Sequence, residues 1–258
     1  GGGRGGGGAV GPCVAARVGR VWVRVDLVRA WVLVRRFVPG RIGFGMGFGG
    51  EGQLIAHSVV TQGLDIDVAT IDTGRLFPET YELWERTEAR YARRVRAVYP
   101  QAAPLEALIE EQGINGFYKS VDARKACCHV RKVEPLSRLL AGVSGWVTGL
   151  RADQSQARAE APLIAFDETH RVLKLNPLAD YTRDAVVAAV EAFSVPINDL
   201  HAKGFLSIGL PPSSRAVLPR ADRPPCPSWW DARHQQSCAP HVRADGVLRR
   251  GAPQEASL

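Results

Sequence analysis

The pattern of hydrophobic and polar positions divides the chain into three parts. Residues 1–46 are rich in Gly, Arg and Val and show neither helical periodicity nor clear helix caps. Residues 47–208 alternate between apolar, strand-like runs and helix-like segments, and residues 209–258 are rich in Pro and Arg. We therefore expect one domain at 47–208, an N-terminal segment outside its core and an irregular C-terminal tail.

The central part predicts strands and helices in alternation. We expect strands at 66–71, 95–98, 145–150, 163–166 and 171–175, and helices at 53–60, 78–94, 105–111, 131–140 and 182–193. Pro78 suits a first helical turn, and Thr182 suits a helix cap. This alternation predicts an α/β fold with a mostly parallel sheet. Ligands of such sheets bind beyond the carboxyl ends of the strands, so the polar loops after residues 71 and 150 should face one pocket.

Composition narrows the class of protein. The 33 Lys and Arg residues outnumber the 26 Asp and Glu residues, and the formal net charge of +7 suits an anionic partner such as a nucleotide or a sulfate ester. No run of basic residues is interleaved with aromatic ones, which argues against a nucleic-acid partner. The five cysteines include the adjacent pair Cys127 and Cys128, which suits a reducing, cytoplasmic setting better than a disulfide scaffold.

Membrane and metal-hydrolase functions are not favoured. The apolar run 21–38 is interrupted by charges such as Arg24, Asp26 and Arg35, and no apolar core is followed by a signal-peptide cleavage site. We expect a soluble protein without a membrane partner. The six histidines include no pair at the helical i, i+4 spacing that is typical of a zinc site.

Two polar loops carry groups that suit an anion. Residues 72–75, Asp-Thr-Gly-Arg, follow an apolar strand, so their backbone N–H groups can approach a phosphate while Asp72 accepts a hydrogen bond from a ribose or an amino group. Arg151 and Arg158, with small polar neighbours, suit a doubly charged oxyanion. Taken singly, each loop is as typical of a solvated surface turn.

Cysteines supply a second kind of chemistry. Cys127 and Cys128 precede Arg131 and Lys132, whose charges would stabilise thiolates. Two thiolates cannot complete an iron–sulfur site that needs four, and a buried pair at a helix start is the alternative. Cys238 lies on the irregular tail, where a mobile thiol can act as a nucleophile.

In their order along the chain, these motifs resemble the phosphosulfate reductase family, in the adenylyl-sulfate branch with vicinal cysteines. The resemblance covers residues 47–241. Residues 127–136 reproduce the pattern Cys-Cys-x-x-Arg-Lys-x-x-Pro-Leu, 71–75 correspond to Leu-Asp-Thr-Gly-Arg, and 151–155 reproduce Arg-x-Asp-Gln-Ser. The family's phosphate loop, Ser-Phe-Gly-Ala-Glu-Asp, corresponds to 47–52, which keep its Phe, Gly and Glu but lose its Ser and Asp.

The resemblance implies a Rossmann-like adenine-nucleotide alpha-hydrolase fold that reduces adenylyl sulfate to sulfite and AMP, in sulfate assimilation and cysteine biosynthesis. It places substrate binding at Phe48, Gly49, Glu51, Asp72, Thr73, Gly74, Arg75, Arg151, Asp153, Gln154, Ser155, Arg158 and Arg215. Cys238 would attack the sulfate sulfur, and thioredoxin or glutaredoxin would release sulfite from the S-sulfocysteine. A homo-oligomer is compatible with the sequence.

The resemblance also implies a 4Fe-4S cluster, with Cys127 and Cys128 as two of its ligands. Leu210 and Ser213 stand where the family has the other two cysteines, and Gly and Leu are lost after Cys238. These departures are typical of a degenerate or frame-shifted copy. Three alternatives remain. One is a phosphoadenylyl-sulfate reductase, although that branch usually lacks the cysteine pair. The others are a non-catalytic nucleotide-binding remnant and an ATP pyrophosphatase, and the phosphate loop disfavours the last.

Overall fold

The computed structural model describes residues 38–154, 158, 161–205, 207–209 and 214, together with 17–18, 21–22 and 31. Residues 17–18 (β1) and 21–22 (β2) form a short antiparallel pair. Within this described part, no helix is both long and apolar enough to cross a membrane.

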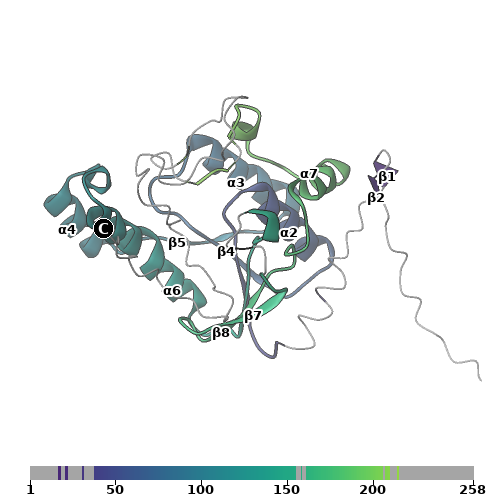
Figure 1. The fold of residues 1–258 in the computed structure, drawn as a ribbon, viewed down its shortest axis with the longest axis horizontal. Coiled ribbons are helices and arrows are strands. Elements are labelled where there is room, and N and C mark those ends of the chain that lie inside the picture. Colours follow the sequence, from purple (N-terminus) through teal and green to yellow (C-terminus); the bar gives the residue numbers. More distant parts are fainter. Residues whose placement is uncertain are drawn as a thin grey trace, which may run out of the picture.

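A six-stranded sheet forms the centre of the fold (Figure 1). Its strands are β3 (Ile42–Gly45), β4 (Asp67–Ile71), β5 (Arg96–Val98), β6 (Gly145–Val147), β7 (Ile164–Asp167) and β8 (Val172–Leu175). Their order is β5-β4-β3-β6-β8-β7, and every pairing is parallel except that of β7 with β8. The α/β class and the mostly parallel sheet expected from the sequence are confirmed.

Helices cover both faces of the sheet (Figure 1). One face packs against α2 (Gly50–Thr61), α3 (Pro78–Tyr91) and α7 (Arg183–Ala192). The other face packs against α6 (Glu134–Leu140), with α4 (Ala102–Gln112) and α5 (Val121–Cys128) on the same side. Local sequence explains several of these helices: Pro78 occupies the first turn of α3, and the side chains of Thr182 and Ser120 cap α7 and α5 by accepting backbone N–H bonds.

The larger hydrophobic core lies beneath α2, α3 and α7. Phe44 from β3, Ile55 from α2, Leu83 from α3 and Val147 from β6 are fully buried there. The smaller core, on the opposite face, joins Leu139 and Leu140 of α6 to neighbouring strands. Side chains alternate between the two faces along each strand, so a residue's position in a strand decides which core it enters.

The structure corrects the N-terminal boundary expected from the sequence. The central strand β3 begins at Ile42, and Trp31 and Val38 belong to the larger core, although residues 1–46 were expected to lie outside it. The four residues of β3 read Ile-Gly-Phe-Gly, so only two side chains carry an apolar strand signal. The hydrophobic periodicity of the sequence therefore does not by itself predict the central strand of the sheet.

The helix expected at 131–140 is longer and irregular. A π-helical segment at His129–Val133 joins α5 to α6, so the helical path runs from Val121 to Leu140. Pro135 lies in the first turn of α6 and has no N–H to donate to the preceding turn. Such a change of hydrogen-bond register is frequent at functional sites, and here it directly follows the cysteine pair.

Candidate functional site

Two polar networks lie at the carboxyl ends of the parallel strands. The first includes the turn after β4, residues 72–75, and the second includes the loop after β6, residues 149–154. No hydrogen bond or ion pair joins the two networks within the part of the chain that the structure describes. The sequence predicts both loops at this edge, and the topology of the sheet has them there; that they face one pocket stays a prediction.

Asp72 is a fixed acceptor at the end of β4. Its side chain is buried, and its Oδ1 accepts a hydrogen bond of 2.8 Å from the backbone N–H of Gly74. The hydroxyl of Tyr81 donates to both carboxylate oxygens, at 2.9 and 3.0 Å. Burial, together with the hydrogen bond to Asp72 and the charge of that carboxylate, raises the pKa of Tyr81 to about 12. The hydroxyl therefore remains protonated and holds the carboxylate in place.

Arg75 contacts the connection between α4 and α5. Its guanidinium donates to Asn115 Oδ1 at 3.2 Å and to the carbonyl of Ile114, and it lies 5.0 Å from the centre of the Phe117 ring. These partners belong to the connection between α4 and α5. Arg75 therefore joins the turn after β4 to the segment that leads to the cysteine pair.

Arg131 connects the cysteine helix to the same turn. Its side chain is buried, its Nη1 donates to the carbonyl oxygen of Thr73 at 2.6 Å, and its Nε has no acceptor among the described residues. A Cβ at Gly74 would lie 3.3 Å from Nη1, and the φ of +70° at this position also favours glycine. Arg131 is thus packed tightly against the turn.

Burial and the neighbouring arginines shift the pKa of the Cys127 thiol in opposite directions. Burial raises the pKa of its thiol, while a hydrogen bond and the charge of Arg131, together with the more distant charge of Arg75, act to lower it. The net direction is upward. Cys127 and Cys128 are both half-buried.

The second network is centred on Arg151, whose side chain is buried. Its Nε donates to Glu51 Oε1 at 3.0 Å, and its Nη1 bonds to both carboxylate oxygens of Asp153, at 2.9 and 3.0 Å. The Nε2 of Gln154 donates to the same Glu51 oxygen at 3.3 Å. Glu51 lies in the first turn of α2, so this network joins the phosphate-loop segment to the Arg151 loop.

Arg158 extends the network. Its Nη1 donates to Gln154 Oε1, and burial lowers the pKa of its guanidinium while the charge of Glu51 acts in the opposite direction. Asp153 Oδ2 also accepts a 2.7 Å hydrogen bond from the backbone N–H of Arg183, at the start of α7. Each carboxylate of the network is therefore engaged by Arg151, whereas Arg158 has no ion-pair partner within the described residues.

Some expected site residues occupy other roles, and others lie outside the described residues. The ring of Phe48 is buried in the larger core and stacks on Trp84 with centroids 5.4 Å apart, so its side chain does not line an open site. Gly49 is the N-terminal cap residue of α2, beside Glu51. Ser155, Arg215 and Cys238 lie outside the described residues, as do Leu210 and Ser213. Tyr81 was missed from the sequence because its spacing of nine residues from Asp72 matches no motif.

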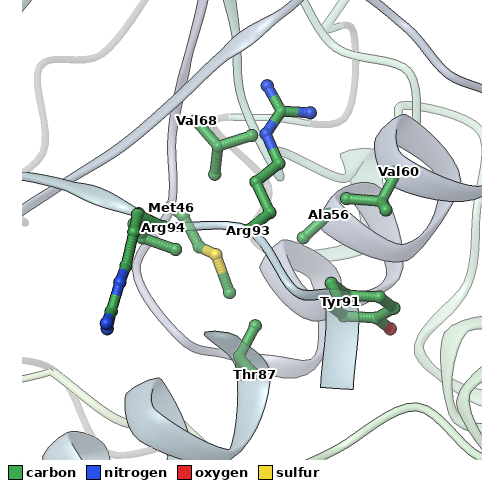
Figure 2. Close-up of a pocket in the computed structure, with 9 residues that line it drawn as sticks. Met46, Ala56, Val60, Val68, Thr87, Tyr91, Arg93 and Arg94 are labelled. Carbon is green, nitrogen blue, oxygen red and sulfur yellow. The ribbon is translucent and has the colours of Figure 1, made fainter. Parts of the chain in front are cut away.

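A small cavity lies elsewhere, between the sheet, α2 and α3 (Figure 2). Met46, Ala56, Thr87 and Tyr91 are among its lining residues, and the side chains are mostly apolar where they face it. None of the residues of the two networks lines this cavity. It is therefore a space within the hydrophobic packing and separate from the candidate site.

Comparisons of the sequence with family models and with known proteins point to the same family. Residues 44–216 match the family model described as the phosphoadenosine phosphosulfate reductase domain. The chain is 39% identical to an adenosine 5'-phosphosulfate reductase of Burkholderia cepacia over 91% of each chain, and 43% identical to one of Sinorhizobium fredii over 80% of this chain and 82% of the relative.

A solved structure shows the same fold. The phosphoadenylyl-sulfate reductase from Candida auris, in a phosphate complex, has a TM-score of 0.62 and 24% sequence identity, and the match covers 78% of this chain and 100% of the other. At this level of identity the likeness bears on the fold, which is the adenine-nucleotide alpha-hydrolase type expected from the sequence.

Proposed function

Because the chain belongs to the phosphoadenosine phosphosulfate reductase family, we propose that it is an oxidoreductase that reduces adenylyl sulfate to sulfite and AMP in sulfate assimilation. The observation that carries this proposal is the identity of 39% to 43% with adenosine 5'-phosphosulfate reductases over most of both chains. The intact cysteine segment at 127–136 supports the adenylyl-sulfate branch.

The two networks suit the two charged parts of such a substrate. In the proposal, the turn at residues 72–75, with Asp72, holds the nucleotide, and the Arg151 loop binds the sulfate ester. Arg151 is already oriented by Glu51 and Asp153, so binding does not require its side chain to become ordered. A guanidinium suits a tetrahedral oxyanion because its fork of donors matches the acceptor oxygens.

The reaction step belongs to Cys238, on the C-terminal tail from residue 209 onward. The thiolate attacks the sulfate sulfur, a sulfur–sulfur bond forms, and the bond from that sulfur to the phosphate oxygen breaks with release of AMP. A dithiol of the thioredoxin or glutaredoxin class then reduces the S-sulfocysteine, is oxidised to a disulfide and releases sulfite. We place this chemistry in the cytoplasm, where such dithiols are kept reduced.

The iron–sulfur cluster implied by the family does not fit the donor set of this chain. A 4Fe-4S cluster is held by four thiolates, and Cys127 and Cys128 supply two. Leu210 has no ligand atom and Ser213 offers only a hydroxyl at the other two positions. Among the described residues, no three His, Cys, Asp or Glu side chains are grouped to hold a metal ion. No step of the proposed reaction is therefore assigned to a cluster.

An assay with two substrates tests the proposal. Purified protein is incubated with a reduced thioredoxin system and either adenylyl sulfate or its 3'-phosphorylated form, and sulfite and the released nucleotide, AMP or its 3'-phosphorylated form, are measured. We expect sulfite from adenylyl sulfate. Sulfite from the 3'-phosphorylated form alone would favour the phosphoadenylyl-sulfate alternative. Binding of AMP without sulfite from either substrate would favour a non-catalytic remnant.

A further inference from the structure

The turn after β4 uses most of its backbone donors within the fold. The N–H of Asp72 donates to the carbonyl oxygen of Val98 at 3.0 Å. The N–H of Gly74 donates to Asp72 Oδ1 at 2.8 Å. The N–H of Arg75 donates to the hydroxyl of Thr73 at 3.3 Å. The sequence predicts that these N–H groups approach a phosphate, whereas here they are already engaged, so the turn does not present the free donors that an anion needs.

Hydrogen-bond acceptors remain open beside the same turn. Each oxygen of a carboxylate can accept about two hydrogen bonds. Asp72 Oδ1 accepts from Gly74 and Tyr81, whereas Oδ2 accepts only from Tyr81 within the described residues. The Tyr81 hydroxyl has a single proton, which it donates to the carboxylate, so its oxygen keeps lone pairs for another donor. Burial, with the hydrogen bond and charge of Asp72, raises the pKa of Tyr81 to about 12, and the proton therefore stays in place at neutral pH.

The charge of this acceptor pair selects the kind of ligand. Asp72 is buried, and no ion pair compensates its carboxylate in the part of the chain that the structure describes. The arginine of the turn, Arg75, is instead bonded to Asn115 and to the carbonyl of Ile114. A phosphate or sulfate group beside Asp72 would be repelled. The pair therefore suits a group that donates hydrogen bonds and carries no negative charge.

The spacing of the two acceptors favours a diol over an amino group. Asp72 Oδ2 and the hydroxyl oxygen of Tyr81 lie 3.0 Å apart. The two N–H bonds of an amino group diverge, so acceptors that each take one of them in a linear bond of about 2.9 Å lie about 5 Å apart. Two hydroxyls on adjacent carbons of a sugar lie side by side, and each can donate to one of two neighbouring acceptors.

We propose that Asp72 and Tyr81 together bind the cis-diol of a ribose. One sugar hydroxyl donates to Asp72 Oδ2, and the other donates to the hydroxyl oxygen of Tyr81. Tyr81 is 40% exposed, so a ligand at the carboxyl end of β4 can approach it. That the ribose belongs to the adenine nucleotide rests on the proposed function. The inference gives Tyr81 a binding role and assigns the sugar, rather than a phosphate or the adenine, to this turn.

Calorimetric titration of the full-length protein with AMP and with its 2'-deoxy and 3'-deoxy forms tests the contact. We expect Tyr81→Phe, which keeps the ring, to weaken AMP binding by roughly twofold to tenfold, the range for a neutral hydrogen bond. Both deoxy forms should bind the parent protein more weakly than AMP does. For one of them, Tyr81→Phe should have no further effect, because the two changes remove the same contact. Tyr99→Phe, at an exposed tyrosine directly after β5, is the matched control and should leave AMP affinity unchanged.

A titration with IMP separates the diol from the base. IMP keeps the diol but lacks the amino group of AMP, so Tyr81→Phe should weaken the binding of both nucleotides by the same factor. A loss for AMP alone would place the amino group at Tyr81 and overturn the inference. An equal loss for AMP and both deoxy forms would show a structural tyrosine and overturn it as well.

The outcomes also separate this inference from the proposed function. The expected coupling between Tyr81→Phe and one deoxy form, without sulfite release in the assay, would support the ribose site and contradict the proposed activity. Sulfite release without that coupling would contradict the ribose site alone. The absence of saturable AMP binding to the parent protein would overturn the inference, whatever the result of the assay.

Discussion

Arg131 donates a 2.6 Å hydrogen bond from Nη1 to the backbone carbonyl oxygen of Thr73 and so ties the cysteine helix to the turn after β4. The two residues are 58 positions apart in the sequence, and both are buried. A substrate bound at the turn after β4 and a reaction of the cysteine thiols therefore act on two elements that this hydrogen bond links. The π-helical segment at His129–Val133 includes this arginine and sets the direction of its side chain.

Replacing Arg131 by Met should have two measurable effects. The carbonyl of Thr73 loses its partner, and we expect the free energy of unfolding to fall by roughly 1–3 kcal/mol, the cost of an unsatisfied buried acceptor. The pKa of Cys127 should rise further, because burial then acts with less opposition. Alkylation of Cys127 by iodoacetamide at mildly alkaline pH, followed by mass spectrometry, should be slower. Lys125→Met, on the exposed side of the same helix, is the control.

Replacing Arg151 by Ala should weaken binding of the sulfate ester by roughly 1.5–3 kcal/mol, the range for a charge-assisted hydrogen bond. The variant also leaves Glu51 without its strongest partner, so thermal unfolding must be measured alongside calorimetry with AMP and a sulfate-ester analogue. Arg96→Ala removes a partly exposed ion pair with Asp67 at the opposite end of the strands and provides a matched control. Unchanged affinity in Arg151→Ala would remove this loop from the site.

The sequence predicted the fold class better than it predicted contacts. Most strands and helices were expected within a few residues of their bounds, because apolar runs and caps are local signals. The central strand β3 was missed because Gly43 and Gly45 carry no side chain to form an alternating pattern. Lys174 was expected in a strand, yet its burial depends on Trp146 across the sheet, which no local pattern shows.

The candidate site was predictable in part. The ends of the expected parallel strands placed Asp72 and Arg151 at the same edge of the sheet, and the topology has both there. The partners that fix them come from other elements: Tyr81 from α3 holds Asp72, and Glu51 from α2 holds Arg151. Glu51 was expected to bind substrate. Its contact with the Arg151 loop could not be predicted, because it depends on how α2 packs against the sheet.

His57 should make stability depend on pH. Burial, and to a lesser degree the charge of Arg90, lower the pKa of His57, whose ring stacks on Phe193 and lies 3.1 Å from the Tyr91 hydroxyl. The unfolded chain binds a proton below about pH 6.5 more readily than the folded protein does. The contribution of His57 to the free energy of unfolding is therefore complete above that pH. It is lost as the pH falls through the lowered pKa that His57 has in the folded protein.

Urea unfolding at about pH 5.5 and about pH 7.5 measures this effect, since these values bracket the ordinary histidine pKa. We expect the difference between the two midpoints to be smaller in His57→Gln than in the parent protein. An identical difference in both proteins would show that other groups cause the pH dependence.

The cysteine pair should not hold a stable cluster in this chain. With Leu210 and Ser213 at the remaining ligand positions, anaerobically purified protein should contain little iron or acid-labile sulfide. The Leu210→Cys/Ser213→Cys double variant, purified in the same way, should gain both together with a visible charge-transfer band. Stoichiometric iron and sulfide in the parent protein would contradict this prediction and require other ligands, such as Cys226, in place of residues 210 and 213.

Any reductase activity should depend on Cys238. Cys127 and Cys128 match ligand positions of the family, Cys13 lies before the region of resemblance, and Cys226 has no counterpart in the family motifs. Cys238 is thus the thiol placed like the family's nucleophile, although it lies outside the described residues. Replacing it by Ser should abolish sulfite release from adenylyl sulfate, because a serine hydroxyl is a far weaker nucleophile at neutral pH.

The residues after Cys238 should make this activity low. The tail must bring the thiolate within roughly 3–3.5 Å of the sulfate sulfur, a geometry on which the rate depends steeply. Ala239 replaces a glycine that can adopt backbone conformations unfavourable for alanine, and Pro240 has a fixed φ and no N–H. The Ala239→Gly/Pro240→Leu double variant should therefore release sulfite faster than the parent protein in the thioredoxin assay. Equal rates in the parent protein and in Cys238→Ser would contradict the nucleophile assignment, and a double variant no faster than the parent would show that tail closure does not limit the reaction.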